Sequence, residues 1–311
     1  MKILAGLLFL SCSVFAADLR VGIIGTDTSH VPAFTKLLND GSDPNHIAGA
    51  RVVAAFKGGS KDIPHSIDRV DKYADEIHTK WGVEIVPDIA TLVAKVDVVL
   101  IESVDGRPHL EQARPVIAAH KPFFVDKPLA ATLDDAREIA RLAQAANVKW
   151  FSASSLRWGQ IATEMKFADA TGAITWGPGP FEEHHPVDLA WYAIHPIETL
   201  FVLLGTGCEE VTRIAGKDMD ETTCCWKDGR IGTVRSLRPY GEYGAIVFRP
   251  KQVVHSPEKP KAGYLPLVQD IVKFFQTGVV PVPNAETLEI MAFMDAAQRS
   301  KEAGGKPMHL R

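Results

Sequence analysis

The chain has 311 residues, of which 46% are hydrophobic and 23% are charged. This length predicts two domains, and the composition is that of an ordinary globular protein, which excludes long disordered stretches. The 34 basic and 38 acidic residues give a formal net charge of −4, and no cluster of lysine and arginine occurs. Nucleic-acid binding is therefore excluded first.

Residues 1–17 have the layout of a signal peptide. Met1-Lys2 carries a positive charge, an apolar run covers residues 3–10, and Val14-Phe15-Ala16 offers a cleavage site. The run is too short to span a bilayer, so we expect a Sec-type export signal, a periplasmic or extracellular protein and no integral membrane span. Two alternatives stay open, a buried first strand and a lipid anchor on Cys12.

Three further cysteines, Cys208, Cys224 and Cys225, follow near the C-terminal half. An odd number permits at most one intrachain disulfide, for which Cys208 with Cys224 or Cys225 is the candidate pair. The alternative is three buried thiols. The spacing does not resemble a zinc site.

Short β-branched runs alternate with amphipathic segments between Leu19 and Phe151. The runs cover residues 19–24, 51–56, 83–86, 96–101, 122–125 and 148–151, and the helical segments lie near 32–39, 67–81, 89–95, 110–119 and 133–146. Because runs such as Val98–Ile101 lack period-two alternation, they predict strands that are buried on both faces. Residues 18–151 therefore predict a Rossmann-type, doubly wound parallel sheet, in which ligands lie beyond the carboxyl ends of the strands.

The pattern changes after Phe151. Helices are expected near 159–169, 189–204, 265–277 and 285–302, a Gly/Pro-rich stretch at 177–180, and strands at 210–215, 222–226, 230–236 and 244–248. A run of strands flanked by helices predicts a C-terminal α+β domain over residues 152–311 with a largely antiparallel sheet.

The turn after the first strand is the candidate dinucleotide loop. A dinucleotide fold requires Gly25-x-Gly-x-x-Gly there, but Asp27 and His30 replace the second and third glycines. Thr26 and Ser29 still offer hydroxyls at a helix N-terminus. The alternative is a capped helix that binds nothing.

The end of the second strand carries Lys57 where an acidic residue normally accepts the ribose hydroxyls of NAD. Lys57 favours the extra phosphate of NADP or another anion, or it is a solvated turn lysine. Whether the chain binds NAD, NADP or neither thus stays open. Glu102 and Asp126 follow the fourth and fifth strands and are expected beside the cofactor.

Three stretches, in this order and spacing, resemble the Gfo/Idh/MocA (glucose–fructose oxidoreductase/inositol dehydrogenase) family. They are the opening Val21–Gly25, His109 at the start of a helix, and Asp126-Lys127-Pro128 where the family carries Glu-Lys-Pro. The C-terminal stretches at 281–288 and 296–300 are also similar to the family's last helices, so the resemblance covers nearly all of the mature chain.

The resemblance implies roles for several residues. Lys127 matches the lysine that contacts nicotinamide ribose and substrate, and His195 matches the histidine that removes a hydroxyl proton. The family's aspartate four residues earlier is Trp191 here, although Glu198 supplies an acid one turn later. We therefore expect Lys127, His195 and Glu198 to be catalytic. A core histidine is the alternative for His195.

Substrate contacts are expected from four residues: His109, Arg157, His185 and Tyr192. A domain-hinge ion pair is the alternative for Arg157. His185 belongs to an acidic and histidine-rich cluster over residues 182–188 that suggests a metal, but adjacent histidines in a strand face opposite sides, and we assign no metal there.

Three functions follow. The first is an NAD(P)-dependent oxidoreductase acting on a sugar, a polyol or a derivative. The second is a cofactor-independent lyase, hydrolase or isomerase in the same cleft, and the third is a carbohydrate-binding protein without catalysis. Homo-oligomers are expected to form through the strands near 222–236.

Overall fold

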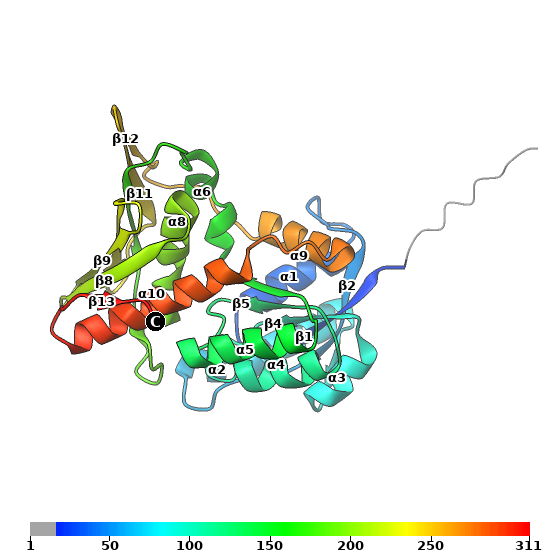
Figure 1. Ribbon diagram of the computed structural model, residues 1–311. Helices are drawn as coiled ribbons and strands as arrows, with labels where there is room; N and C mark the ends of the chain where they lie inside the picture. Colours follow the sequence, from blue (N-terminus) through cyan, green and yellow to red (C-terminus); the bar gives the residue numbers. More distant parts are fainter. Residues whose placement is uncertain (1–16) are drawn as a thin grey trace, which may run out of the picture.

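The computed structural model of the protein describes residues 17–311. The expected signal peptide, except its last residue, and Cys12 lie outside the described residues. Two α/β units lie side by side (Figure 1). Within the described part of the chain, no helix has the length and apolar character needed to cross a membrane.

The first unit is a six-stranded, wholly parallel sheet, as the sequence predicts. Its strand order is β3-β2-β1-β4-β5-β6. The strands are β1 (Leu19–Ile24), β2 (Ala50–Phe56), β3 (Glu84–Val86), β4 (Val98–Ile101), β5 (Phe123–Asp126) and β6 (Trp150–Ala153). Both faces carry helices, namely α1 (His30–Asn39), α2 (Pro64–Trp81), α3 (Ile89–Lys95), α4 (His109–Ala118) and α5 (Leu133–Ala145).

The second unit contains a seven-stranded mixed sheet of order β12-β11-β7-β10-β9-β8-β13. Every pair is antiparallel except β7 with β10. The strands are β7 (Gly172–Pro178), β8 (Cys208–Ala215), β9 (Met219–Trp226), β10 (Ile231–Leu237), β11 (Gly244–Arg249), β12 (Gln252–His255) and β13 (Met308–His309). The expected, largely antiparallel α+β domain is confirmed. A disulfide joins Cys208 to Cys224, and Cys225 is an exposed free thiol.

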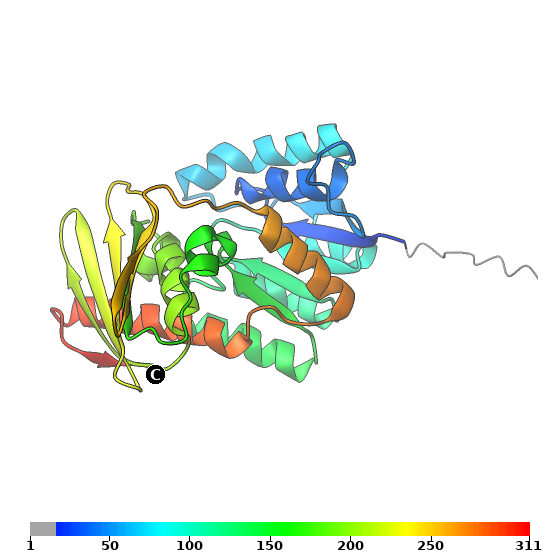
Figure 2. The ribbon, with the colours of Figure 1, turned by 90° about the horizontal axis from the view of Figure 1, so that it is seen from above.

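Helices α8 (Ile194–Leu204) and α10 (Asn284–Glu302) cover one face of this sheet. The other late helix, α9 (Leu265–Thr277), returns to the first unit and packs beside α1 (Figure 2). Its apolar face, including Ile271 and Phe274, shares one core with Phe34 and Phe151. The C-terminal segment therefore completes one face of the first unit as well as forming the second.

The sequence analysis missed strand β7 in the middle of the second sheet. Its segment contains Gly172, Gly177 and Pro178, which are unfavourable in strands. Gly177 is required there by close packing, because a Cβ atom would lie 2.4 Å from the ring of Tyr243. Tertiary packing overrides the local preference.

Two expected helices also differ from the structure. In place of the helix expected at 159–169, the chain forms only the short helix α6 (Gln160–Glu164), which follows the 3-10 helix η1 (Ser155–Trp158). The expected helix at 189–204 is split into α7 (Asp188–Trp191) and α8, because Tyr192 leaves the helical conformation with φ −138° and ψ −35°. This break turns Tyr192 and His195 toward the same cavity.

Candidate active site

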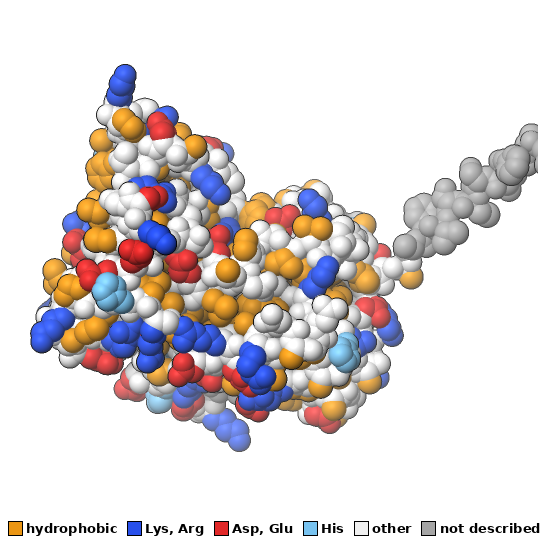
Figure 3. All heavy atoms as spheres, viewed as in Figure 1, with side chains coloured by type: hydrophobic (Ala, Val, Ile, Leu, Met, Phe, Trp, Pro, Cys, Tyr) orange, Lys and Arg blue, Asp and Glu red, His pale blue; other side chains and the backbone are white. Residues whose placement is uncertain are grey.

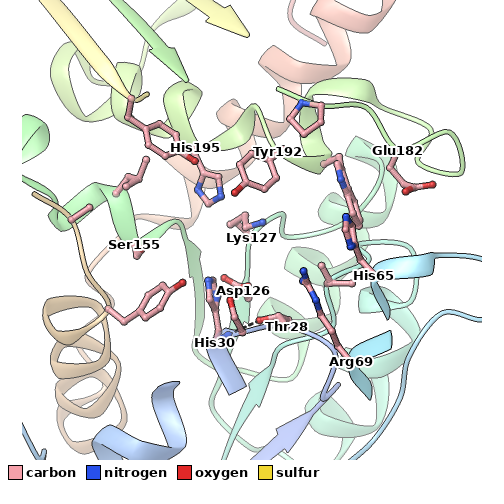
Figure 4. A pocket seen from close by; sticks show the side chains of 18 of the residues that line it. Thr28, His30, His65, Arg69, Asp126, Lys127, Ser155, Glu182, Tyr192 and His195 are labelled. Carbon is pink, nitrogen blue, oxygen red and sulfur yellow. Dashed lines mark hydrogen bonds and ion pairs between the residues drawn. The ribbon is translucent and has the colours of Figure 1, made fainter. Parts of the chain in front are cut away.

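A cavity of about 630 Å³ lies between the two units, beyond the carboxyl ends of β1 and β5. Side chains from both units line it (Figure 4). They include Thr28, Ser29, His30, His65, Arg69, Asp126, Lys127, Ser155, Glu182, Trp191, Tyr192, His195, Tyr243 and Tyr264. Its size and mixture of aromatic and polar groups suit a small molecule.

Lys127 lies in the middle of this cavity, with Asp126 and His30 on one side and Tyr192 and His195 on the other (Figure 4). Its ammonium is 5.6 Å from the centre of the Tyr192 ring, and that ring stands edge-on to His195 at 5.2 Å. Burial lowers the pKa of Lys127, although the carboxylates of Asp126, Glu198 and Glu102 act in the opposite direction. A lysine in such a site can donate a proton to a substrate oxygen.

His195 is held across the boundary between the units. Its Nδ1 lies 2.7 Å from Oγ of Ser154, which follows strand β6. Nε2 has no hydrogen-bond partner among the described residues. Burial, and secondly the nearby Lys127 charge, lower the pKa of His195 well below its usual range, so the imidazole is neutral and able to accept a proton.

Glu198 lies behind His195 and does not line the cavity. Its carboxylate accepts a hydrogen bond from the Ser154 backbone N–H at 2.8 Å and one from Arg157 Nε at 3.0 Å. Burial raises the pKa of Glu198 to about 7, while Arg157 and the Ser154 N–H oppose this. Glu198 thus contacts Ser154 and Arg157 behind the residues that face the cavity, and its predicted catalytic role stays a prediction.

His30, Glu102 and Asp126 form a compact buried cluster at the floor of the cavity. Nδ1 of His30 is 2.8 Å from Oδ2 of Asp126 and 3.9 Å from Oε2 of Glu102. Burial, and secondly the Asp126 carboxylate, raise the pKa of Glu102 well above its usual range. The His30 ring acts in the opposite direction on the neighbouring carboxylate and lowers the pKa of Asp126 against its burial.

The turn between β1 and α1 is closed by its own side chains. Gly25 adopts φ +89°, and a Cβ atom there would lie 2.3 Å from Ser103 Oγ. The Asp27 carboxylate accepts hydrogen bonds from Ser66 Oγ at 2.6 Å and from the Val104 N–H at 3.0 Å. Burial raises the pKa of Asp27, and these two hydrogen bonds lower it. Asp27 thus fastens the turn to α2 and to the segment after β4.

Helix α2 lies directly over this turn. The Thr26 hydroxyl donates to the carbonyl of Val70 at 2.7 Å, and the Thr26 N–H donates to the Lys57 carbonyl at 2.8 Å. The Lys57 ammonium is bound to Asp71 at 2.8 Å on the surface. In a Rossmann-type fold this turn faces the diphosphate and adenosine ribose of a dinucleotide, and here Thr26, Asp27 and Lys57 make contacts within the chain instead. The Lys127 end of the cavity remains open.

Three expected substrate contacts lie away from the cavity lining. His109 is fully buried, with its ring nitrogens 3.0 Å from the carbonyls of Pro128 and Ser103. Arg157 forms ion pairs with Glu198 and Glu286, as expected under the alternative to a substrate contact. His185 is buried against the Val187 carbonyl. The polar groups of these three residues thus contact other segments of the chain rather than the cavity.

The residues at 182–188 do not converge on a common metal position. His184 pairs with Glu182 at 2.7 Å, whereas Asp188 binds Arg213 and Lys301. Within residues 17–311, the histidine and carboxylate groups that come together are instead His30, Glu102 and Asp126.

Sequence reasoning missed His65, Arg69 and Tyr264. Helix α2 begins at Pro64, three residues earlier than expected, and Pro is favoured in the first turn of a helix. His65 and Arg69 are four residues apart, so a helix beginning at Pro64 places both on one face toward the cavity. Tyr264 directly precedes α9 and reaches the cavity only because α9 returns to the first unit.

The fold and the cavity define a two-domain α/β protein with a ligand site at the edge of a Rossmann-type sheet. Residues 19–154 match the family model GFO_IDH_MocA, described as "Oxidoreductase family, NAD-binding Rossmann fold". The N-terminal domain of the chain thus resembles the Gfo/Idh/MocA oxidoreductases over these residues.

Known relatives agree with this placement. The chain is 30% identical over 163 residues to an inositol 2-dehydrogenase of Paracoccus denitrificans. The aligned region covers 50% of this chain and 43% of that protein. The chain thus matches less than half the length of this curated relative. A solved myo-inositol 2-dehydrogenase of Lactobacillus plantarum superposes with a TM-score of 0.75 at 15% identity, covering 95% of this chain and all of that one.

A second solved structure is an oxidoreductase from Agrobacterium radiobacter in complex with NAD+, L-tartaric acid and magnesium. It superposes with a TM-score of 0.74 at 16% identity and covers 94% of this chain and 99% of that one. At this identity, the likeness establishes the shared fold of both units.

Proposed function

We propose that the protein is an oxidoreductase acting on a sugar, a polyol or a derivative, with Lys127 and His195 moving the proton of a substrate hydroxyl. The observation that carries this proposal is the convergence of Lys127, Tyr192 and His195 on one cavity at the end of β5. The match of residues 19–154 to an oxidoreductase family supports the reaction class.

The cavity suits a ring that carries several hydroxyls. Trp191, Tyr192, Tyr243 and Tyr264 supply aromatic surface, and the three tyrosines also supply hydroxyls that can donate or accept hydrogen bonds. Because the Paracoccus relative is an inositol 2-dehydrogenase, the inositol stereoisomers are the first substrates to test.

In this proposal the neutral His195 accepts the hydroxyl proton through Nε2, since Ser154 engages Nδ1. The Lys127 ammonium stabilises the developing negative charge on the substrate oxygen. A nicotinamide cofactor, when bound, supplies the hydride acceptor. Ser29 and Lys127 at the open end of the cavity are the residues that would face its reactive half.

A second function, cofactor-independent proton-transfer chemistry on a sugar derivative, is favoured by one specific observation. Asp27 and Thr26 bind α2 and the segment after β4, and so occupy the place of the diphosphate. Lys127 and His195 would then act as acid and base in an elimination or an isomerisation.

One experiment separates the two functions. The protein is denatured to detect any carried cofactor, and NAD+, NADH, NADP+ and NADPH are then titrated calorimetrically. Micromolar binding, together with inositol-dependent reduction of the cofactor that is lost in Lys127→Ala and His195→Ala, would support the oxidoreductase. No binding and no carried cofactor would refute it in favour of the second function.

We further propose that the protein forms homo-oligomers through the open face of the second sheet. Ile231, Phe248 and Val253 lie in one register row across β10, β11 and β12 and are 36–54% exposed. Apolar side chains also gather at this end of the molecule in Figure 3. Light scattering should give a multiple of the mass of one chain, and Ile231→Lys should give the single mass. A wild-type monomer would refute this proposal.

A further inference from the structure

We propose that the cavity contains a binding site for one divalent transition-metal ion, zinc or manganese, formed by His30, Glu102 and Asp126. These residues begin α1, follow β4 and end β5, so the parallel sheet brings them together at one edge. One ligand atom of each lies within 4.8 Å of the other two. The site is independent of whether the cavity performs redox chemistry.

The spacing of these atoms suits a shared cation. Ligands about 2.1 Å from a metal are about 3.0 Å apart at right angles and about 3.4 Å apart in a tetrahedron. The two separations from His30 Nδ1, 2.8 Å to Asp126 and 3.9 Å to Glu102, lie on either side of these values. Small side-chain rotations would bring all three atoms to a common ion.

Each of the three residues has a buried polar atom without a hydrogen-bond partner. Glu102 is fully buried, and neither of its carboxylate oxygens has a hydrogen-bond partner. Oδ1 of Asp126 also lacks a hydrogen-bond partner, while Nδ1 of His30 makes the ion-pair contact of 2.8 Å with Oδ2 of Asp126. A buried carboxylate without a partner is costly, and a cation at this position would satisfy all three groups.

The donor set indicates the type of ion. An imidazole favours zinc and other transition metals over magnesium, while carboxylates also accept manganese. The Lys127 ammonium is a competing cation in this cavity, but it lies over the Tyr192 ring, 5.6 Å from the ring centre (Figure 4).

The open side of the site faces the substrate space. His30 and Asp126 line the cavity, whereas Glu102 lies beneath them. An ion held by three protein ligands keeps further coordination positions, which here face the cavity. A hydroxyl or carbonyl oxygen of a bound sugar derivative can occupy one of them. The metal would thus orient and polarise the substrate beside Lys127 and His195.

The test uses the mature full chain, stripped with a chelator and titrated calorimetrically with ZnCl2, MnCl2 and MgCl2. We expect one equivalent of zinc or manganese to bind with micromolar or tighter affinity, and magnesium to bind much more weakly. Cobalt(II) at the same site should give visible absorption bands of a low-symmetry complex. These readouts require neither a substrate nor a nicotinamide cofactor.

Two variants and a control assign the site. Glu102→Gln keeps the shape of the side chain but removes one ligand, and His30→Gln removes another. Each of these single variants should weaken metal binding about 100-fold. His65→Gln removes a histidine that lines the same cavity outside the cluster, and should bind the metal like the wild type. Circular dichroism and thermal melts establish that each variant is folded.

The outcomes are distinct. Stoichiometric binding that is lost in the two ligand variants and kept in His65→Gln supports the site. No binding by the wild type at millimolar zinc or manganese, or equal binding by a folded Glu102→Gln, would overturn it. In the latter case the bound metal is elsewhere. Either result leaves the nicotinamide titration above to decide the proposed function on its own evidence.

Discussion

Oγ of Ser154 lies 2.7 Å from Nδ1 of His195 and connects the last strand of the parallel sheet to the first turn of α8 in the other unit. The Ser154 N–H also donates to Glu198 in the next turn of α8. One residue thus fixes both the orientation of the proposed base and the seating of the helix that carries it. The serine aligns the base without itself lining the cavity.

Replacing Ser154 by alanine is therefore expected to reduce kcat about 10-fold and to change KM little. The imidazole loses its orientation, while the groups that contact the substrate remain. The measurement is steady-state kinetics on the sugar or inositol that the protein turns over. Ser155→Ala, the neighbouring serine that lines the cavity without contacting His195, is the control. An unchanged kcat in Ser154→Ala, or an equal loss in the control, would contradict this role.

Asp27→Gly tests whether the closed turn excludes the dinucleotide. This change restores the second glycine, removes the carboxylate and frees the space beside Ser66 and Val104. We expect the affinity for NAD+ to rise about 10-fold or more. The free energy of unfolding should fall by about 1–3 kcal/mol, because two buried donors lose their acceptor.

The readouts for this prediction are calorimetric titration of NAD+ and chemical denaturation. Lys57→Ala is the control, because its exposed pair with Asp71 contributes less than about 1 kcal/mol. If the wild type already binds NAD+ tightly and Asp27→Gly changes nothing, Asp27 does not close the site.

Much of the fold was predictable because its signals are local. Uninterrupted β-branched runs such as Val98–Ile101 and the strong pattern of Leu265–Thr277 gave strands and helices close to those observed. What failed depends on distant residues. Strand β7 is stabilised by neighbours on both sides, and Gly177 is selected by the ring of Tyr243 rather than by strand preference.

The candidate site was predictable only in part, for a related reason. Lys127 and His195 match residues of the family motifs, and both face the cavity together with Tyr192, an expected substrate contact. His109 and Arg157 were also expected to contact the substrate. In the structure, His109 lies against backbone carbonyls and Arg157 pairs with a carboxylate of another segment. A sequence pattern gives the type of side chain, whereas the partners available in the folded chain decide whether it faces a ligand.

The buried carboxyl of Glu198 should make stability depend on pH. Its pKa rises from 4.5 to about 7 on folding, chiefly through burial. The folded state therefore binds more protons than the unfolded state between these values. The contribution of Glu198 is fully present below about pH 4.5 and is lost as the pH rises through about 7. It amounts to about 3 kcal/mol at most.

The measurement is the free energy of unfolding of the wild type and of Glu198→Gln from pH 4 to pH 8. The glutamine cannot ionise but can still accept hydrogen bonds from Ser154 and Arg157. The wild type should lose stability relative to this variant as the pH rises between 4.5 and 7.5. If the stability of the wild type relative to Glu198→Gln instead stays constant or rises with pH, Arg157 keeps the carboxylate ionised.

The disulfide between Cys208 and Cys224 should stabilise the second unit. The two residues lie 16 positions apart on neighbouring strands, and closing a loop of this length is worth about 3 kcal/mol in the unfolded chain. The double variant Cys208→Ala/Cys224→Ala should therefore melt several degrees lower. Cys225→Ser, which alters the adjacent exposed thiol, should melt like the wild type.

The same bond tests the proposed export of the protein. Structural disulfides persist in oxidising compartments and are rare in the reducing cytosol. Protein from the exported fraction should therefore show one thiol that reacts with maleimide in denaturant, and reduction should expose two more. If three thiols react without reduction, the bond is absent in the cell. Export and the stabilising role of the disulfide would then both lose their support.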